Sequence, residues 1–138
     1  MTVARTLPAE VAPRFRRAAR VLVRTGEASF EAVVAERLGL RLRGLAGLAQ
    51  GDLVPLLFPR CRSLHTLGMR TEIDVVWLEA APDGHASVLA VEARAERRRF
   101  LRAPKGVKLE RATALELAPG AAVALGLVPG RRFQLAKP

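Results

Sequence analysis

Short apolar blocks, most of them alternating with polar residues, recur along the chain after residue 19. A period of two places alternate side chains on one face of a strand, so each block predicts a strand of a sheet. Two pairs of blocks are joined by turn residues, Thr25-Gly26-Glu27 and Asp83-Gly84, which predict hairpins. We predict strands over residues 20–24, 29–35, 54–58, 73–79, 87–93, 113–117 and 132–135.

Two segments break this strand pattern. Residues 36–45 place three leucines on one helical face and most of their arginines elsewhere, which predicts a short amphipathic helix that ends at Gly44 or Gly47. A single helical turn is predicted over residues 121–125. Six or seven short strands at hairpin spacing, with one or two short helices, indicate a mainly β (α+β) fold: a small antiparallel, half-closed β-barrel.

The N-terminal segment does not follow the barrel pattern. Residues 1–19 are rich in Pro and Arg, and Pro8 and Pro13 would break a long helix. We predict a loose basic arm over this segment, with a short helix over residues 9–20 as the alternative, and the sequence leaves open whether the arm is ordered. At 138 residues the chain fits one core, so residues 20–138 are predicted to form a single barrel-like domain.

Cysteine usage and hydropathy bear on the compartment. Cys61 is the single cysteine, which cannot form an internal disulfide and favours a reducing cytoplasm. Arginines interrupt the region where a signal sequence would need an apolar run, and no segment approaches the roughly 20 apolar residues that span a bilayer. The sequence therefore predicts a cytoplasmic protein without a transmembrane segment.

The net charge of +10 is concentrated in two segments. Residues 1–43 hold nine arginines against four glutamates, and residues 94–111 hold eight basic against two acidic residues. Such segments attract phosphates, acidic proteins and anionic lipids alike. The abundance of Arg and Ala also fits a coding bias toward high GC content, so the charge alone does not identify a partner.

The basic segment over residues 94–111, predicted to be a loop as far as residue 107, is one candidate site. It could bind a polyanion, either nucleic acid or an acidic protein, with Phe100 stacking on a base. The alternative is a solvated charged loop, because the chain has few aromatic residues and no recognisable nucleic-acid-binding module. The candidate anion-binding residues are Arg97, Arg98, Arg99, Arg102 and Lys105.

A second candidate site is the polar turn that runs into the strongest predicted strand, within residues 63–78. If the turn folds back over the strand, an imidazole, a hydroxyl, a guanidinium and a carboxylate converge on a pocket for a small polar or anionic ligand. Gly68 is expected to need a positive φ, and Met69 to join the core. The alternative for Asp74 is structural: it would accept backbone N–H bonds from the turn over residues 67–71. The candidate ligand-binding residues are His65, Thr66, Gly68, Met69, Arg70 and Asp74.

Three segments carry a resemblance to a known family. Residues 41–45 resemble an Arg-x-x-Gly-Leu motif, residues 63–75 match His-Thr-x-Gly-Met-Arg-x-x-Ile-Asp-Val, and residues 115–120 begin a Leu-Glu-x-x-x-Gly pattern. Across residues 20–136 the chain therefore resembles the domain of unknown function 192 family of prokaryotic proteins. The resemblance implies a compact barrel-like fold and no assigned activity. The chain departs from the family pattern at Ala46, Leu48 and Arg131.

The sequence also suggests a catalytic set and a metal site, but the pattern favours neither. Cys61 and His65, with Asp74 as the orienting group, could form a nucleophilic set, and adding His85 could form a metal site. These residues do not have the regular short spacing of metal-ligand motifs, and the family motif does not include the cysteine. We therefore predict no metal and no cofactor.

These observations support three functional hypotheses. The first is a non-catalytic domain that binds a small ligand or a partner in a polar pocket at the His65 turn. The second is polyanion binding through residues 94–111. The third is a hydrolase-type enzyme that uses His65 with Asp74 or Cys61.

Overall fold

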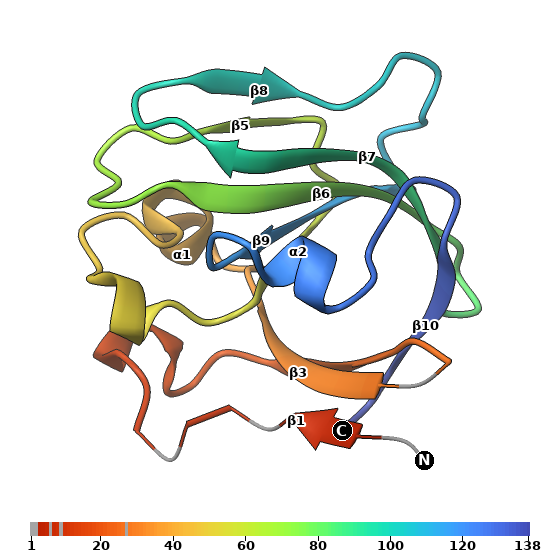
Figure 1. Cartoon of the computed structure of the whole chain (residues 1–138), viewed down its shortest axis with the longest axis horizontal. Helices are drawn as coiled ribbons and strands as arrows, with labels where there is room; N and C mark the ends of the chain where they lie inside the picture. The colour runs from red at the N-terminus through yellow and green to blue at the C-terminus, as the bar shows by residue number, and fades with distance from the viewer. Residues whose placement is uncertain (1–2, 6, 9, 27) are drawn as a thin grey trace.

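The computed structural model describes residues 3–5, 7–8, 10–26 and 28–138, and its largest feature is a closed barrel of seven strands (Figure 1). The hydrogen-bonded order is β3-β2-β10-β7-β6-β9-β4, and β4 pairs back to β3. This closing pair is parallel, whereas the other pairs in the barrel are antiparallel. The predicted small, mainly β barrel is confirmed, and the structure adds that it closes. The strands are β2 (Arg20–Arg24), β3 (Ala28–Val34), β4 (Leu56–Pro59), β6 (Ile73–Ala80), β7 (His85–Ala95), β9 (Ala112–Leu117) and β10 (Arg132–Ala136).

Alternate side chains of these strands fill the barrel interior. Leu115 and Leu117 of β9 belong to this interior cluster, as do Val76 and Leu78 of β6. The one-turn helix α2 (Ala121–Ala124) packs against the same cluster through Ala122, which is fully buried. Side chains therefore fill the barrel, as is usual at this strand number.

A second apolar core lies outside the barrel, on the other faces of β4, β6 and β9. Trp77 of β6 and Ala114 of β9 belong to it, and the segments that cover it come from residues 13–15, 35–54 and 61–69. Phe15 of the 3-10 helix η1 (Pro13–Phe15) is fully buried there. The outer core is thus a layer wrapped over one side of the barrel.

The predicted N-terminal arm contributes to this architecture. Strand β1 (Val3–Arg5) pairs in parallel with β3, and Phe15 packs in the outer core. Residues 10–19 contain the 3-10 helix and no α-helix, so the alternative of a helix over residues 9–20 is wrong for the described part. Residues 1, 2, 6 and 9 of the predicted arm, and Glu27 of the first predicted turn, lie outside the described residues. The division at residue 19 stays a prediction.

The predicted amphipathic helix forms as α1 (Leu38–Arg43) and ends at Gly44, but its buried face was predicted wrongly. Leu38 and Leu42 are 72% and 62% exposed, and only Leu45, which follows the helix, is buried. With six residues, the helix has fewer than two turns. Arg41 fixes its orientation by donating to the carbonyl oxygens of Ala35, Pro59 and Arg60 at 2.7–3.1 Å.

The basic loop predicted over residues 94–107 contains a strand. Strand β8 (Phe100–Arg102) pairs antiparallel with β5 (Ser63–His65) in a separate two-stranded sheet, which places His65 opposite Phe100. The sequence prediction missed it because only one of its three residues, Leu101, is buried. A further 3-10 helix, η2 (Gln50–Asp52), precedes β4. None of the described helices is long and apolar enough to cross a membrane.

Candidate functional site

The turn after β5 is fixed on the outer core by glycine geometry. Gly68 has a φ of 78°, and its carbonyl oxygen accepts a hydrogen bond from the Gly47 N–H at 3.0 Å. Met69 is buried in the outer core. The positive φ of Gly68 and the core position of Met69 are confirmed. Arg70 is exposed, with Nη1 at 3.5 Å from the Gly47 carbonyl oxygen.

Thr66 is buried, and its hydroxyl group forms hydrogen bonds with backbone groups. Its Oγ1 donates to the carbonyl oxygen of Glu96 at 2.7 Å and accepts from the Arg99 N–H at 2.8 Å. A hydroxyl has one proton to donate, and here it is used. Thr66 therefore ties the β7–β8 connection to the turn, and it does not border the groove described below.

Asp74 is fully buried and accepts two backbone hydrogen bonds. Oδ1 accepts from the Arg94 N–H at 2.8 Å, and Oδ2 from the Ala122 N–H at 2.9 Å. The structural alternative for Asp74 is therefore the one that the geometry supports. The expected donors were wrong: they belong to β7 and α2 and not to the turn over residues 67–71. Because Asp74 shares its strand face with Val76 and Leu78, it points to the barrel interior and away from the outer core.

A groove of about 240 Å³ opens between α1 and the turn after β5. Its walls come from residues 38–46 on one side and from residues 61–69, including His65, on the other. Three of its apolar lining residues, Leu38, Leu42 and Leu67, are 42–72% exposed. Glu116 of β9 also lines it, and we call it the Glu116 groove. Of the six predicted ligand-binding residues, His65 and Met69 line this groove, and the other four do not.

Glu116 is the residue that sequence reasoning missed. It is 3% exposed, and its Oε1 has no hydrogen-bond partner among the described residues. Burial raises the pKa of Glu116 to about 8, so the carboxyl group is protonated at pH 7. The available signal was a lone acid on the same strand face as Ala114, which the period of two places outside the barrel.

Gly44 allows the end of α1 to lie against Glu116. It has a φ of 50°, and a Cβ atom at this position would lie 3.2 Å from Glu116 Oε1 and 3.4 Å from Phe58 Cζ. A larger residue would therefore crowd the unpartnered oxygen. The glycine that ends the helix also makes room for the carboxyl group.

Cys61 and His65 both line the groove, but they are not arranged as a nucleophile and base. Cys61 is buried, its Sγ donates to the Ser63 carbonyl oxygen at 3.2 Å, and burial raises the pKa of its thiol. The exposed His65 accepts at Nδ1 from the Leu67 N–H at 3.3 Å. A raised thiol pKa reduces the thiolate fraction that a nucleophilic cysteine needs. Asp74, the expected orienting group, faces the barrel interior.

The structure does not assemble the weakly indicated metal site. His85 lies at the β6–β7 turn, where Nδ1 is 3.1 Å from Asp83 Oδ2. Within the described ranges, no three His, Cys, Asp or Glu side chains are close enough to hold a metal ion.

In the basic segment over residues 94–111, two of the predicted anion-binding arginines lie beside acidic residues. Arg97 and Arg98 line a shallow recess together with two acids, Glu72 and Glu96. Phe100 is 74% exposed, and its ring centroid lies 6.2 Å from that of His65. The other predicted anion-binding residues, Arg99, Arg102 and Lys105, are exposed.

Two solved structures resemble this one. A protein of unknown function from Novosphingobium aromaticivorans aligns with a TM-score of 0.62 and 17% identity, over 94% of this chain and 92% of that one. A "putative transcription regulator" from Sinorhizobium meliloti aligns with a TM-score of 0.59 and 22% identity, over 84% of this chain and 92% of that one. No family model and no curated protein matches the chain. At these identities the likeness shows the fold alone.

Proposed function

We propose that the protein binds a small ligand in the Glu116 groove, through a hydrogen bond to the Glu116 carboxyl group and apolar contacts with the exposed leucines at its rim, Leu38, Leu42 and Leu67. The observation that carries this proposal is that Glu116 Oε1 has no hydrogen-bond partner among the described residues. A buried polar atom without a hydrogen bond costs about 1–3 kcal/mol, and a ligand that supplies the partner recovers that cost. The ligand class is a small molecule or side chain with a carbonyl, amide or carboxyl group on an apolar body.

The size and charge of the groove support this ligand class. A volume of about 240 Å³ lies below the usual range of about 300–1,000 Å³ for drug-sized ligands, so the occupant is small. A protonated carboxyl group can donate to a carbonyl oxygen or pair with a carboxyl group. The Arg41 guanidinium, in the groove wall, is already bonded to three backbone carbonyl oxygens and serves to fix α1.

The family resemblance points to the same place. Each of the three segments that resemble the domain of unknown function 192 family contributes to the walls of this groove: residues 41–45 from the first, residues 63–65, 67 and 69 from the second, and Glu116 from the third. We infer that the chain belongs to that family. A cytoplasmic location stays a prediction.

The placement of the side chains favours ligand binding in the groove over two alternatives, catalysis at His65 and polyanion binding through residues 94–111. The buried Cys61 thiol has a raised pKa, and Asp74 is bonded inside the barrel, so neither assists His65. Around the recess at Arg97 and Arg98 the acids balance the arginines, which weakens the prediction of a polyanion site there.

The test is a ligand-observed NMR screen with small ketones, amides, carboxylic acids and amines at pH 6.5. We expect carbonyl and carboxyl fragments to bind the parent and to weaken at least tenfold in Glu116→Leu, which removes the carboxyl group. The matched control is Glu79→Leu, because Glu79 is a half-buried acid on β6 that does not line the groove. Equal binding to the parent and Glu116→Leu would refute the proposal.

A further inference from the structure

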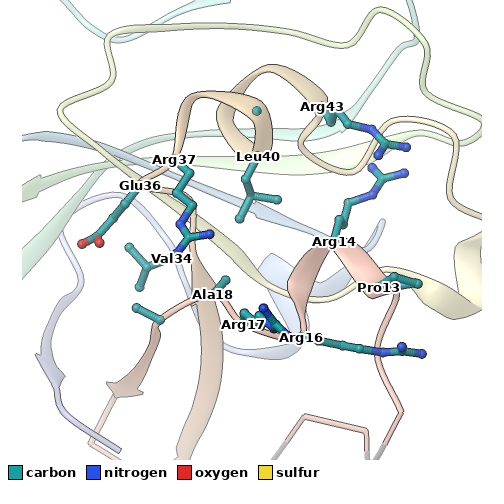
Figure 2. Close-up of a pocket in the computed structure, with 12 residues that line it drawn as sticks. Pro13, Arg14, Arg16, Arg17, Ala18, Val34, Glu36, Arg37, Leu40 and Arg43 are labelled. Carbon is teal, nitrogen blue, oxygen red and sulfur yellow. The ribbon is translucent and has the colours of Figure 1, made fainter.

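A second, larger concavity lies on the other side of α1. It is a cleft of about 850 Å³ between residues 13–19 and the segment 34–43. Figure 2 shows its side chains: Arg14 extends toward Arg43, while Arg37 reaches down from the start of the helix toward Arg17. We call this the arginine cleft, and its basic lining residues are Arg14, Arg16, Arg17, Arg37 and Arg43.

The described residues do not neutralise the positive charge in this cleft. Among them, Glu36 is the one acid that lines it, against five arginines. In the described part of the chain, the ion pairs are Arg20–Glu31 and His85–Asp83, and neither includes a cleft arginine. The cleft therefore holds a local charge of about +4. Its guanidinium groups repel one another, and a bound anion would relieve that repulsion.

Arg14 is held in this repulsive position by backbone contacts. Its Nη1 donates to the carbonyl oxygens of Gly44 at 2.9 Å and Ala46 at 2.8 Å. Burial, and to a lesser extent the charge of Arg43, lowers the pKa of Arg14. The fold therefore fixes a guanidinium beside a second cation, an arrangement that a bound anion would stabilise.

We propose that the arginine cleft binds a small ligand that carries two or more phosphate groups. Each phosphate monoester group carries roughly −1.5 to −2 charges near pH 7, so about two of them match the local charge. Guanidinium groups bind phosphate oxygens bidentately, and the volume suits a ligand larger than one phosphate ion. None of the described residues that line the cleft is aromatic, so the cleft recognises phosphates and not a stacked base.

The test compares two triple variants of equal net charge. Arg16→Gln/Arg17→Gln/Arg37→Gln removes three cleft arginines that do not line the Glu116 groove. The control removes three arginines from the β7–β8 connection, Arg97→Gln/Arg98→Gln/Arg99→Gln. Calorimetric titrations with tripolyphosphate, ATP and a single-stranded oligonucleotide are run at 50 and 150 mM salt, with thermal unfolding as the check on folding.

We expect the parent to bind tripolyphosphate and ATP with similar affinity, the cleft variant to bind both at least tenfold more weakly, and the control to stay within about twofold. Equal losses in the two variants would refute the cleft, because net charge alone would then explain binding. Absence of saturable tripolyphosphate binding to the parent would also refute it. Oligonucleotide binding that exceeds tripolyphosphate binding and falls in both variants would overturn it in favour of a nucleic-acid surface. None of these outcomes bears on ligand binding in the Glu116 groove.

Discussion

The barrel interior and the outer layer each bury a carboxyl group, and the two groups differ in their hydrogen bonds. Asp74 is fully buried, and each of its oxygens accepts a backbone N–H bond. Glu116 is almost as buried, but its Oε1 has no partner among the described residues and its pKa is raised to about 8. A satisfied buried carboxyl group stabilises a fold, whereas an unsatisfied one costs stability until a partner supplies the missing hydrogen bond.

The largest expected effect is a pH dependence that comes from Glu116. Burial raises the pKa of Glu116 from its ordinary value of 4.5 to about 8 in the folded protein, so between these pH values the folded state holds a proton that the unfolded state has lost. Stability therefore falls as pH rises from 4.5 to 8, by on the order of 4 kcal/mol from this group. Urea unfolding of the parent and Glu116→Gln at pH 5, 6, 7 and 8 measures it.

The Glu116→Gln variant should lack this slope, so the difference between the two free energies of unfolding should grow toward pH 8 in favour of the variant. All other titratable groups are common to both proteins and cancel. If the free energies of unfolding of the two proteins stayed parallel across this pH range, Glu116 would ionise in the folded state as it does in the unfolded chain. The groove would then lack a buried protonated carboxyl group.

The next effect tests the satisfied member of the pair. Asp74→Ala leaves the N–H groups of Arg94 and Ala122 without an acceptor, which should cost about 3 kcal/mol at pH 7 and lower Tm by roughly 10 °C. Thermal unfolding followed by circular dichroism checks this. Asp74→Asn, which keeps one acceptor oxygen, should fall between the parent and Asp74→Ala. A Tm unchanged in both variants would make Asp74 dispensable to the barrel.

The smallest effect concerns the rim of the groove. Leu42 is 62% exposed, so Leu42→Ser should change stability by less than about 0.5 kcal/mol. Leu45 is 1% exposed in the outer core, and Leu45→Ala should cost about 2–5 kcal/mol as the matched contrast. Denaturant unfolding separates them. A large loss in Leu42→Ser would mean that α1 buries this side chain after all.

Much of the barrel was predictable because strand signals are local. The alternation over β2, β3 and β6 and the Asp83-Gly84 turn identified both hairpins, and the run after Gly51-Asp52 identified β4. The short strands β1, β5 and β8 were missed, since strands of three residues carry too little pattern. The parallel return of β4 to β3 was missed as well, because pairing across the intervening α1 segment leaves no local signal.

The candidate site was predicted only in part, for the same reason. The His65 turn was identified as one wall of a pocket, and His65 and Met69 do line the groove. The other wall and the floor come from α1 and β9, so the sequence around the turn could not indicate them. Asp74 was predicted to lie in the pocket because it is close to the turn in sequence. Side chains alternate between the two faces of a strand, however, and Asp74 lies on the face that points into the barrel.

The sequence by itself determined the seven barrel strands, the glycine turns, the end of α1 and the concentration of arginines near the N-terminus. Only the tertiary structure decided which of two buried carboxyl groups is satisfied, and which arginines share a cleft with a single acid among the described residues. The physical reason is that hydrophobic periodicity is a property of neighbouring residues. Hydrogen-bond satisfaction and charge compensation depend on partners 20 to 48 residues away, as the Asp74 bonds illustrate.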